Sequence, residues 1–196
     1  MLKKSIVLFF SMMMFALPAS AASYTVKSGD TLWQIASKNQ IGLSELISLN
    51  PTLKNPDKIN VGDQITISEN EQQAVEEQVV SLVNKERAKE GLAPLTIDWE
   101  LARVAKYKSQ DMHDKNYFSH TSPTYGSPFD MMKSFGISYQ AAGENIAKGQ
   151  TSAAQVMEAW MNSSGHRANI MDAKFTHIGV GYVEDGNYWT QMFSKK

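Results

Sequence analysis

The segment 177–193, HIGVGYVEDGNYWTQMF, constrains the fold more than any other part of the chain. Ile178, Val180 and Tyr182 alternate with two glycines, which is the pattern of a strand whose glycine face lies very close to another segment. Residues 184–187, EDGN, are typical of a hairpin turn, and the residues after them continue as a second strand. This segment therefore predicts an antiparallel hairpin at the end of the chain.

Four patterns with helical spacing precede the hairpin. Ser127 followed by Pro128, and Ser152 with Gln155, are typical first residues of helices, and Gly91 is typical of a helix end. Helices followed by an antiparallel hairpin indicate an α+β domain built in layers. The expected helices cover residues 75–91, 98–116, 127–136 and 152–165, each with apolar residues on one face.

The first residues have the pattern of a secretory leader. Lys3 and Lys4 precede an apolar run over 6–17, which ends in a proline and small residues. This run is shorter than the ~20 apolar residues of a membrane-spanning helix. We therefore expect a signal peptide over 1–21, cleaved at its end, and a secreted protein without a transmembrane anchor; an uncleaved signal anchor is the alternative.

The composition excludes some classes of partner and site. The chain contains no cysteine, so we expect packing to stabilise it, without disulfides or thiolate metal sites. Its formal net charge is −1, and removal of the two leader lysines changes it to −3. This near-neutral balance gives no electrostatic reason to bind nucleic acid or an anionic membrane, and we expect no nucleic-acid partner.

Residues 22–68 have the pattern of a complete small unit. A short strand over 24–26 comes before Thr31 and Gln34, which make a capping box at a helix start. A second helix begins near Ser44 and ends before a proline, and QITIS alternates as in a half-buried strand. The predicted order is strand, helix, helix, strand.

The stretches YTVKSGDTLWQIA and INVGDQITI, with a leucine-rich second helix and NP between them, resemble a LysM module over its whole length. The resemblance implies a β-α-α-β fold that binds polymers containing N-acetylglucosamine, which in bacteria means peptidoglycan. It also implies a shallow groove between two loops; the alternative for Asp30 and Thr31 is that they only cap a helix. The implied glycan-binding residues are Gly29, Asp30, Thr31, Leu32, Asn55, Pro56, Asp57, Lys58 and Ile59.

A polar, acidic segment, residues 69–73, separates this unit from the second module, residues 74–196. The segment contains no glycine or proline and runs directly into a helical pattern. We therefore expect a short linker and semi-rigid coupling of the two modules.

Five segments of the second module occur in this order: LVNKERAKEGLAPLTIDWELARVAKYKSQDM, YFSHTSP, GENIAKG, AWMNSSGHRANIM and IGVGYVEDGNYWTQMF. Together they resemble the bacterial branch of the CAP superfamily, the SCP-like extracellular proteins. The resemblance implies an α-β-α sandwich with a central cavity, lined in typical members by two histidines and two glutamates that can hold a divalent metal. Carried over residue by residue, it gives His120, Glu144 and His166. Ser163 stands where the second glutamate is expected.

His120, Glu144 and His166 leave two chemistries open. Neutral imidazoles and a carboxylate suit zinc and other first-row metals, with positions left for water or substrate. In the alternative, a polar pocket without a metal, Glu144 accepts hydrogen bonds from both rings, which raises the histidine pKa values and lowers its own. The residues identify no certain cofactor, and a divalent metal such as zinc is one alternative.

Other polar residues near these motifs have structural interpretations. His113 stands near a helix end beside Asp114, where positive charge is favourable. Arg167 and Asn169 are expected to hold the turn around His166. The sequence shows no strained nucleophile turn around the three candidate serines, Ser119, Ser122 and Ser163.

Two functions of different classes follow. In the first, the LysM-like module holds a cell-wall protein to peptidoglycan, and the second module binds an envelope protein, peptide or lipid without catalysis. In the second, His120, Glu144 and His166 are catalytic and hold a metal that activates water in a hydrolase of peptide or glycan bonds. Such a hydrolase needs a general base beside the metal, and no residue remains for it, so non-catalytic binding is favoured. We expect the protein in the cell wall, with a spore envelope as a further hypothesis.

Overall fold

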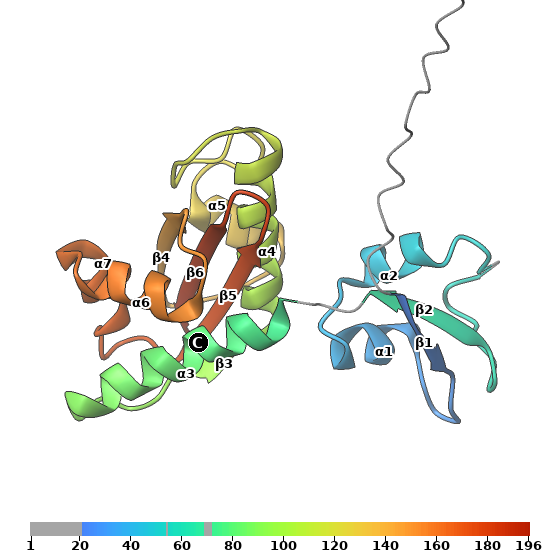
Figure 1. The fold of residues 1–196 in the computed structure, drawn as a ribbon. Helices are drawn as coiled ribbons and strands as arrows, with labels where there is room; N and C mark the ends of the chain where they lie inside the picture. The colour runs from blue at the N-terminus through green and yellow to red at the C-terminus, as the bar shows by residue number, and fades with distance from the viewer. Residues whose placement is uncertain (1–20, 54, 69–71) are drawn as a thin grey trace, which may run out of the picture.

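The computed structural model describes residues 21–53, 55–68 and 72–196 of the chain (Figure 1). The expected leader, apart from its last residue, and most of the expected linker lie outside these residues. Within the described part of the chain, no helix has both the length and the apolar character needed to cross a membrane.

The first module is a two-stranded antiparallel sheet with two helices. Its elements are β1 (Ala21–Thr25), α1 (Leu32–Lys38), α2 (Leu43–Leu49) and β2 (Gln64–Ser68). This is the predicted order, but β1 begins before the expected 24–26 because Ala21 pairs with Ser68. Thr31 and Gln34 form the predicted capping box of α1.

Asn50 joins the helices of this module to its sheet. Its side-chain amide donates to Leu46 O and to Thr66 O, both at 2.8 Å, and its Oδ1 accepts from Thr66 N at 2.7 Å. The residue is buried, so these bonds satisfy polar atoms that have lost water. Helix α2 ends here, as the following proline predicts.

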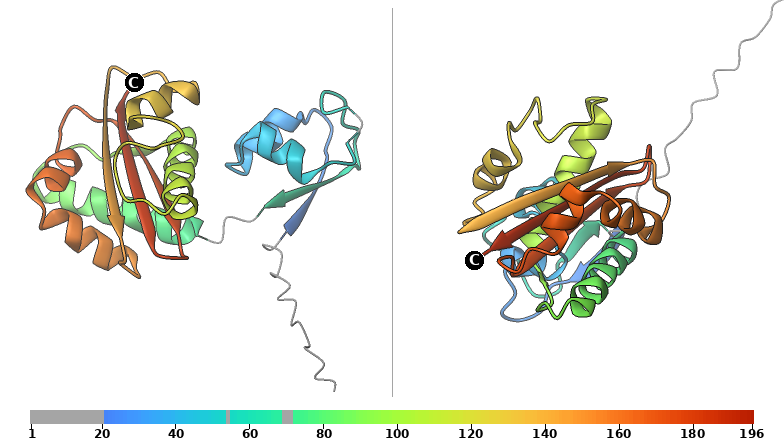
Figure 2. Two further views of the ribbon diagram at one scale, coloured as in Figure 1. Left: turned by 90° about the horizontal axis from the view of Figure 1, so that it is seen from above. Right: turned by 90° about the vertical axis from the view of Figure 1, so that its left-hand side faces the viewer.

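The second module is a four-stranded sheet between two helical layers (Figure 2). The strand order is β3-β5-β6-β4, with β3 parallel to β5 and the other pairs antiparallel. Helices α4 and α5 cover one face, and α3, α6 and α7 cover the other, which confirms the predicted α-β-α sandwich. Its elements are α3 (Gln73–Lys89), β3 (Thr96–Ile97), α4 (Trp99–Asp114), α5 (Pro128–Ser134), β4 (Ala141–Lys148), α6 (Ala153–Met161), α7 (Ser164–Ile170), β5 (His177–Val183) and β6 (Tyr188–Lys195).

The glycine face of β5 lies against the backbone of α4, as the alternation with glycine predicts. A Cβ atom at Gly179 would be 2.1 Å from Ala102 N, and one at Gly181 would be 2.1 Å from Lys106 N. Beside this contact, Ser109 Oγ donates to Gly181 O at 2.9 Å. Helix α4 can therefore lie this close to the sheet only because Gly179 and Gly181 have no side chains.

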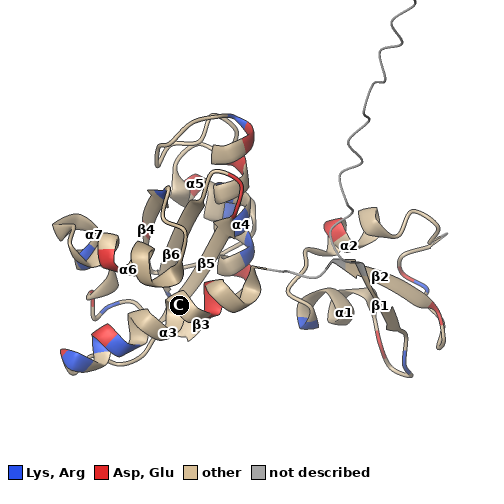
Figure 3. Cartoon of the chain, in the orientation of Figure 1, with Lys and Arg blue, Asp and Glu red and all other residues tan. Residues whose placement is uncertain are grey.

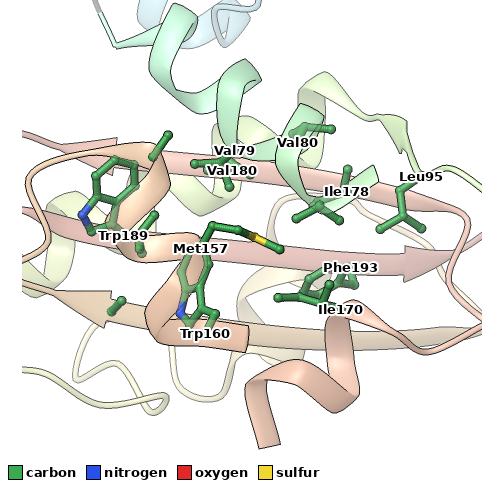
Figure 4. Packing of buried hydrophobic residues seen from close by; sticks show 14 of the residues in the cluster. Val79, Val80, Leu95, Met157, Trp160, Ile170, Ile178, Val180, Trp189 and Phe193 are labelled. Atoms are coloured by element: carbon green, nitrogen blue, oxygen red, sulfur yellow. The ribbon is translucent and has the colours of Figure 1, made fainter. Parts of the chain in front are cut away.

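The opposite face of the hairpin packs against α3 and α6 (Figure 4). Val180, Val79 of α3 and Trp160 of α6 belong to one buried apolar cluster. Tyr182 stacks on Trp189 across the hairpin, with ring centroids 3.8 Å apart. Helix α3 carries both acidic and basic residues (Figure 3), and its buried valines, Val79, Val80 and Val83, face the core as the helical spacing predicts.

Arg87 fastens the end of α3 to the segment after α7. Its guanidinium is buried and donates to the carbonyls of Ala93 at 2.9 Å, Ile170 at 2.7 Å and Asp172 at 2.9 Å. These bonds fix the position of α7, the helix that carries His166.

Three elements depart from the sequence-based prediction, and the two-residue strand β3 is one of them. Strand β4 was not expected, because its central residues are buried on both faces of the sheet and show no alternation. The helix expected over 152–165 ends at Met161, and a separate helix, α7, follows it. Ser163 occupies the N-cap position of α7.

Candidate functional site

A groove of the first module lies beside α1, α2 and the loop before β2. It is lined by Asp30, Thr31, Leu32, Trp33, Leu43, Ile47, Pro56, Asp57 and Ile59. Six of these residues are among those that the LysM resemblance implies, whereas Gly29, Asn55 and Lys58 do not line the groove.

Trp33 gives this groove an apolar surface that the sequence reasoning missed. Its side chain is 60% exposed, and Leu43, which also lines the groove, is exposed too. A large aromatic side chain left in water beside a groove favours a binding role, because burial would otherwise stabilise the fold. The signal was present in the sequence, since Trp33 falls outside the inward stripe formed by Leu32 and Ile35.

Asp30 shapes the loop instead of capping α1. Its Oδ2 accepts hydrogen bonds from Lys27 N and from the Tyr24 hydroxyl, both at 2.8 Å. The amide of Lys27 and then the Tyr24 hydroxyl lower the pKa of Asp30. Thr31 alone caps the helix, so the carboxylate of Asp30 already has partners within its own module.

In the second module, the structure brings His120 and Glu144 together. His120 lies in the segment between α4 and α5, and Glu144 lies on β4. His120 Nδ1 is 2.7 Å from Glu144 Oε1. The Glu144 side chain is 1% exposed and the His120 side chain 54%. A solvent-accessible imidazole therefore contacts a buried carboxyl group.

Burial shifts the pKa values of Glu144 and of His166. It raises the pKa of Glu144, although the hydrogen bond from His120 and the charge of Lys108 oppose it. Burial also lowers the pKa of His166, and the charge of His120 lowers it further. The metal-free pocket, in which Glu144 accepts hydrogen bonds from both rings, predicts a lowered pKa for Glu144 and a raised pKa for His166. Both predictions are wrong, because desolvation outweighs pairing. Glu144 Oε2 has no hydrogen-bond partner among the described residues.

His166 is positioned by amide side chains around α7. Asn145 Nδ2 donates to His166 O at 3.1 Å, and Asn169 Nδ2 donates to Glu144 O at 3.1 Å and to Asn145 Oδ1 at 2.9 Å. The Asn169 side chain thus fastens α7 to β4. The main chain of His166 lies beside Asn145, the neighbour of Glu144 on β4.

The arrangement of these side chains does not fit a resident metal ion. Among the described residues, no three or more His, Cys, Asp or Glu side chains are grouped so that they could hold one. Ser163, in place of the expected glutamate, lies at the start of α7 and offers no carboxylate. The zinc alternative stays a prediction without support from the geometry.

Ser122 has a structural role. It is buried, its Oγ donates to Asp111 Oδ2 at 2.6 Å, and the same oxygen accepts from the amides of Thr124 and Tyr125 at 2.9 Å. Its hydrogen-bonding capacity is therefore used within the segment that carries His120.

Two buried charged residues of α4, Lys108 and Asp111, contact the His120 segment and were missed as site residues. Lys108 Nζ donates to His120 O at 2.7 Å, and Asp111 accepts from Ser122. A signal existed in the sequence, because Lys108 falls on the same helical face as the apolar Leu101 and Met112. Lysine is rarely buried without a partner.

His113 predicts a weak dependence of stability on pH. Its Nδ1 lies 2.7 Å from Asp114 Oδ1 and its Nε2 lies 3.1 Å from Asp185 Oδ2, and these carboxylates raise its pKa above 6.5. A raised folded-state pKa gives stability that is fully present below pH 6.5 and is lost as the pH rises through the folded value. Urea unfolding of wild type and His113→Gln should therefore give a difference in unfolding free energy that shrinks as the pH rises, and it should be small because both carboxylates are exposed. A difference that is constant with pH would contradict this assignment.

Comparisons with known proteins match both modules. The model of the Cysteine-rich secretory protein family (CAP) matches residues 80–193, and that of the LysM domain matches residues 24–68. The uncharacterized protein YkwD of Bacillus subtilis is 67% identical over 123 residues, which are 63% of this chain and 48% of that protein. The cell wall-binding protein YocH of the same organism is 44% identical over 57 residues, which are 29% of this chain and 19% of that protein. The chain thus spans less than half the length of these curated relatives.

A solved structure agrees with the fold. An extracellular protein of Bacillus anthracis that contains a SCP domain superposes with a TM-score of 0.60 and 33% identity, over 69% of this chain and 47% of that one. The CAP match spans more than half of the sequence. This chain therefore belongs to the Cysteine-rich secretory protein family, and a LysM domain precedes its CAP domain.

Proposed function

We propose that this protein is exported and binds peptidoglycan, or a related polymer of N-acetylglucosamine, through the groove of its LysM domain. The observation that carries the proposal is the groove itself, which combines an exposed indole with short polar loops inside a module of this family. The relative named a cell wall-binding protein supports it by its 57-residue match.

The groove has the chemistry that a neutral acetamido sugar needs. Trp33 and Leu43 supply exposed apolar surface for the face of a sugar ring, and the loop residues Thr31 and Asp57 supply polar groups. Asp30 lines the groove as well, but its Oδ2 is already held by Lys27 and Tyr24. Recognition would therefore rest on apolar contact with the sugar face and on hydrogen bonds to Thr31 and to the Asp57 carboxylate.

Trp33→Ala should weaken binding to an N-acetylglucosamine oligomer about tenfold. If a sugar ring covers about 60 Å² of the indole, at about 25 cal/mol per Å² the contact contributes about 1.5 kcal/mol. The fold should survive, because the Trp33 side chain is largely in solvent. Isothermal titration of the two-domain chain with the oligomer measures the change.

Val61→Ala is the matched control for this variant. Val61 is an exposed apolar residue of the same module, and it does not line the groove. Its replacement should leave the dissociation constant unchanged. Equal affinities for wild type and Trp33→Ala would show that the indole does not contact the glycan.

The CAP domain is proposed to bind an envelope peptide or protein beside His120 and Glu144. The Glu144 side chain is 1% exposed, whereas the His120 side chain that it contacts is 54% exposed. The imidazole is therefore the group that would meet a ligand, and it offers its second ring nitrogen for a hydrogen bond. A polar imidazole at the surface suits the hydrogen-bonding groups of a peptide or protein better than the apolar chains of a lipid.

The hydrolase alternative has no geometric observation in its favour. Its metal would need ligands that the described residues do not group together, and its general base would need a side chain besides Glu144. The favoured function is therefore binding by both domains.

A further inference from the structure

The segment that carries His120 has no regular structure of its own, so other residues must hold it. It connects α4 to α5, and its only strand-like feature is a bridge between Ser122 and Gly126 among the described residues. The His120 ring is 54% exposed, so packing contributes little to its position. Hydrogen bonds therefore decide where the imidazole lies.

Asp111 binds the hydroxyl groups of this segment. Its carboxylate accepts from Tyr117 Oη at 2.6 Å, Ser122 Oγ at 2.6 Å and Thr124 Oγ1 at 2.5 Å. Burial by itself would raise the pKa of Asp111, but these hydroxyl groups lower it overall. The segment is thus attached to the rigid helix α4 on both sides of His120.

Lys108 lies one helical turn before Asp111 and reaches His120 itself. Its side chain is fully buried, and Nζ donates to His120 O at 2.7 Å and to Tyr117 Oη at 3.3 Å. Burial lowers the pKa of Lys108, although the charges of Glu144 and Asp111 oppose this shift. A buried ammonium is costly unless it is hydrogen-bonded, and the carbonyl of His120 is its nearest acceptor among these contacts.

His120 is therefore held at two points. Lys108 holds its main-chain carbonyl, and Glu144 holds ring atom Nδ1 at 2.7 Å. If the carbonyl is released, the ring is free to turn into solvent, because its exposed faces lack packing partners. A leucine or methionine at position 108 would pack on the same apolar stripe of α4 without this connection.

We propose that Lys108 is a positioning residue of the His120–Glu144 site of the CAP domain, which fixes His120 by its carbonyl so that the imidazole meets Glu144. The inference rests on the proposed function only in taking this pair of side chains as the binding site. It assigns the buried lysine a role in ligand recognition that acts through His120. Lys108 itself is separated from solvent and does not contact the ligand.

The test is the nuclear Overhauser effect between the His120 ring proton Hε1 and the Glu144 Hγ protons in the two-domain chain. Wild type should show it. Lys108→Met should lose it. The melting temperature should fall as well, because removal of the ammonium leaves the His120 carbonyl and the neighbouring carboxylates without their buried cation, so circular dichroism must show that the variant is folded at the temperature of the measurement. The control Lys106→Met should keep it, since Lys106 donates to Gln72 Oε1 and Tyr182 O and not to the His120 segment.

An undiminished Hε1–Hγ effect in a folded Lys108→Met protein would overturn the proposal. If that variant does not fold, Lys108→Gln serves instead. Its side chain is too short to reach His120 O, so the Overhauser effect should again be lost. An effect that persists in Lys108→Gln would also overturn the proposal. The measurement needs no ligand. A failed binding experiment with the effect intact would therefore count against the proposed function and leave the role of Lys108 standing.

Discussion

Gly181→Ala is expected to unfold most of the CAP domain. The new Cβ atom would lie 2.1 Å from Lys106 N, 2.3 Å from Ala105 C and 2.4 Å from Lys106 Cα. All three are backbone atoms of α4, so no side chain can turn away to relieve the overlap. Adding a methyl group to a packed core costs about 1–3 kcal/mol when the neighbouring groups can shift. Here the whole of helix α4 must move away from the sheet, so the cost should be larger. A domain of ordinary stability has only about 5–15 kcal/mol to lose.

Gly165→Ala is the matched control. Nothing lies within 4 Å of a Cβ at Gly165, and this residue is inside helix α7. Alanine there should stabilise the domain by about 0.5–1 kcal/mol, because it restricts the unfolded chain and favours the helix. Thermal unfolding followed by circular dichroism measures both variants. A Gly181→Ala protein with a wild-type melting temperature would show that α4 does not lie as close to β5 as described.

The hairpin and its glycine face were predictable because they depend on local alternation. Ile178, Val180 and Tyr182 face one layer, and Gly179 and Gly181 face the other, so a period of two residues marks both the strand and its close neighbour. Strand β4 carries the same kind of hydrogen bonding but is buried on both faces. Its sequence, AAGENIAK, therefore has no such period.

The candidate sites were predictable only in part. The resemblance supplied His120 and Glu144, which the structure places in contact, and six residues of the LysM groove. Trp33 and Lys108 were missed for the same physical reason. Each departs from the apolar pattern of its helix, one as an exposed indole and the other as a buried charge. The pattern marks both residues as exceptions, but it does not show which groups they contact.

Removal of residues 22–68 is expected to abolish retention on peptidoglycan. The groove with Trp33 lies within these residues, whereas the CAP domain offers a buried carboxyl group beside an imidazole. The near-neutral net charge of the chain gives the remainder no general attraction to a wall polymer. The two modules also have separate apolar cores, so the CAP domain should keep its fold after the deletion.

Co-sedimentation with purified peptidoglycan tests the central claim most directly. The two-domain chain and the isolated residues 22–68 should pellet with the polymer, and an excess of an N-acetylglucosamine oligomer should release both. The chain without residues 22–68, shown by circular dichroism to be folded, should stay in the supernatant. If this shortened chain pelleted as completely as the two-domain chain, the LysM groove would not be what holds the protein to the wall.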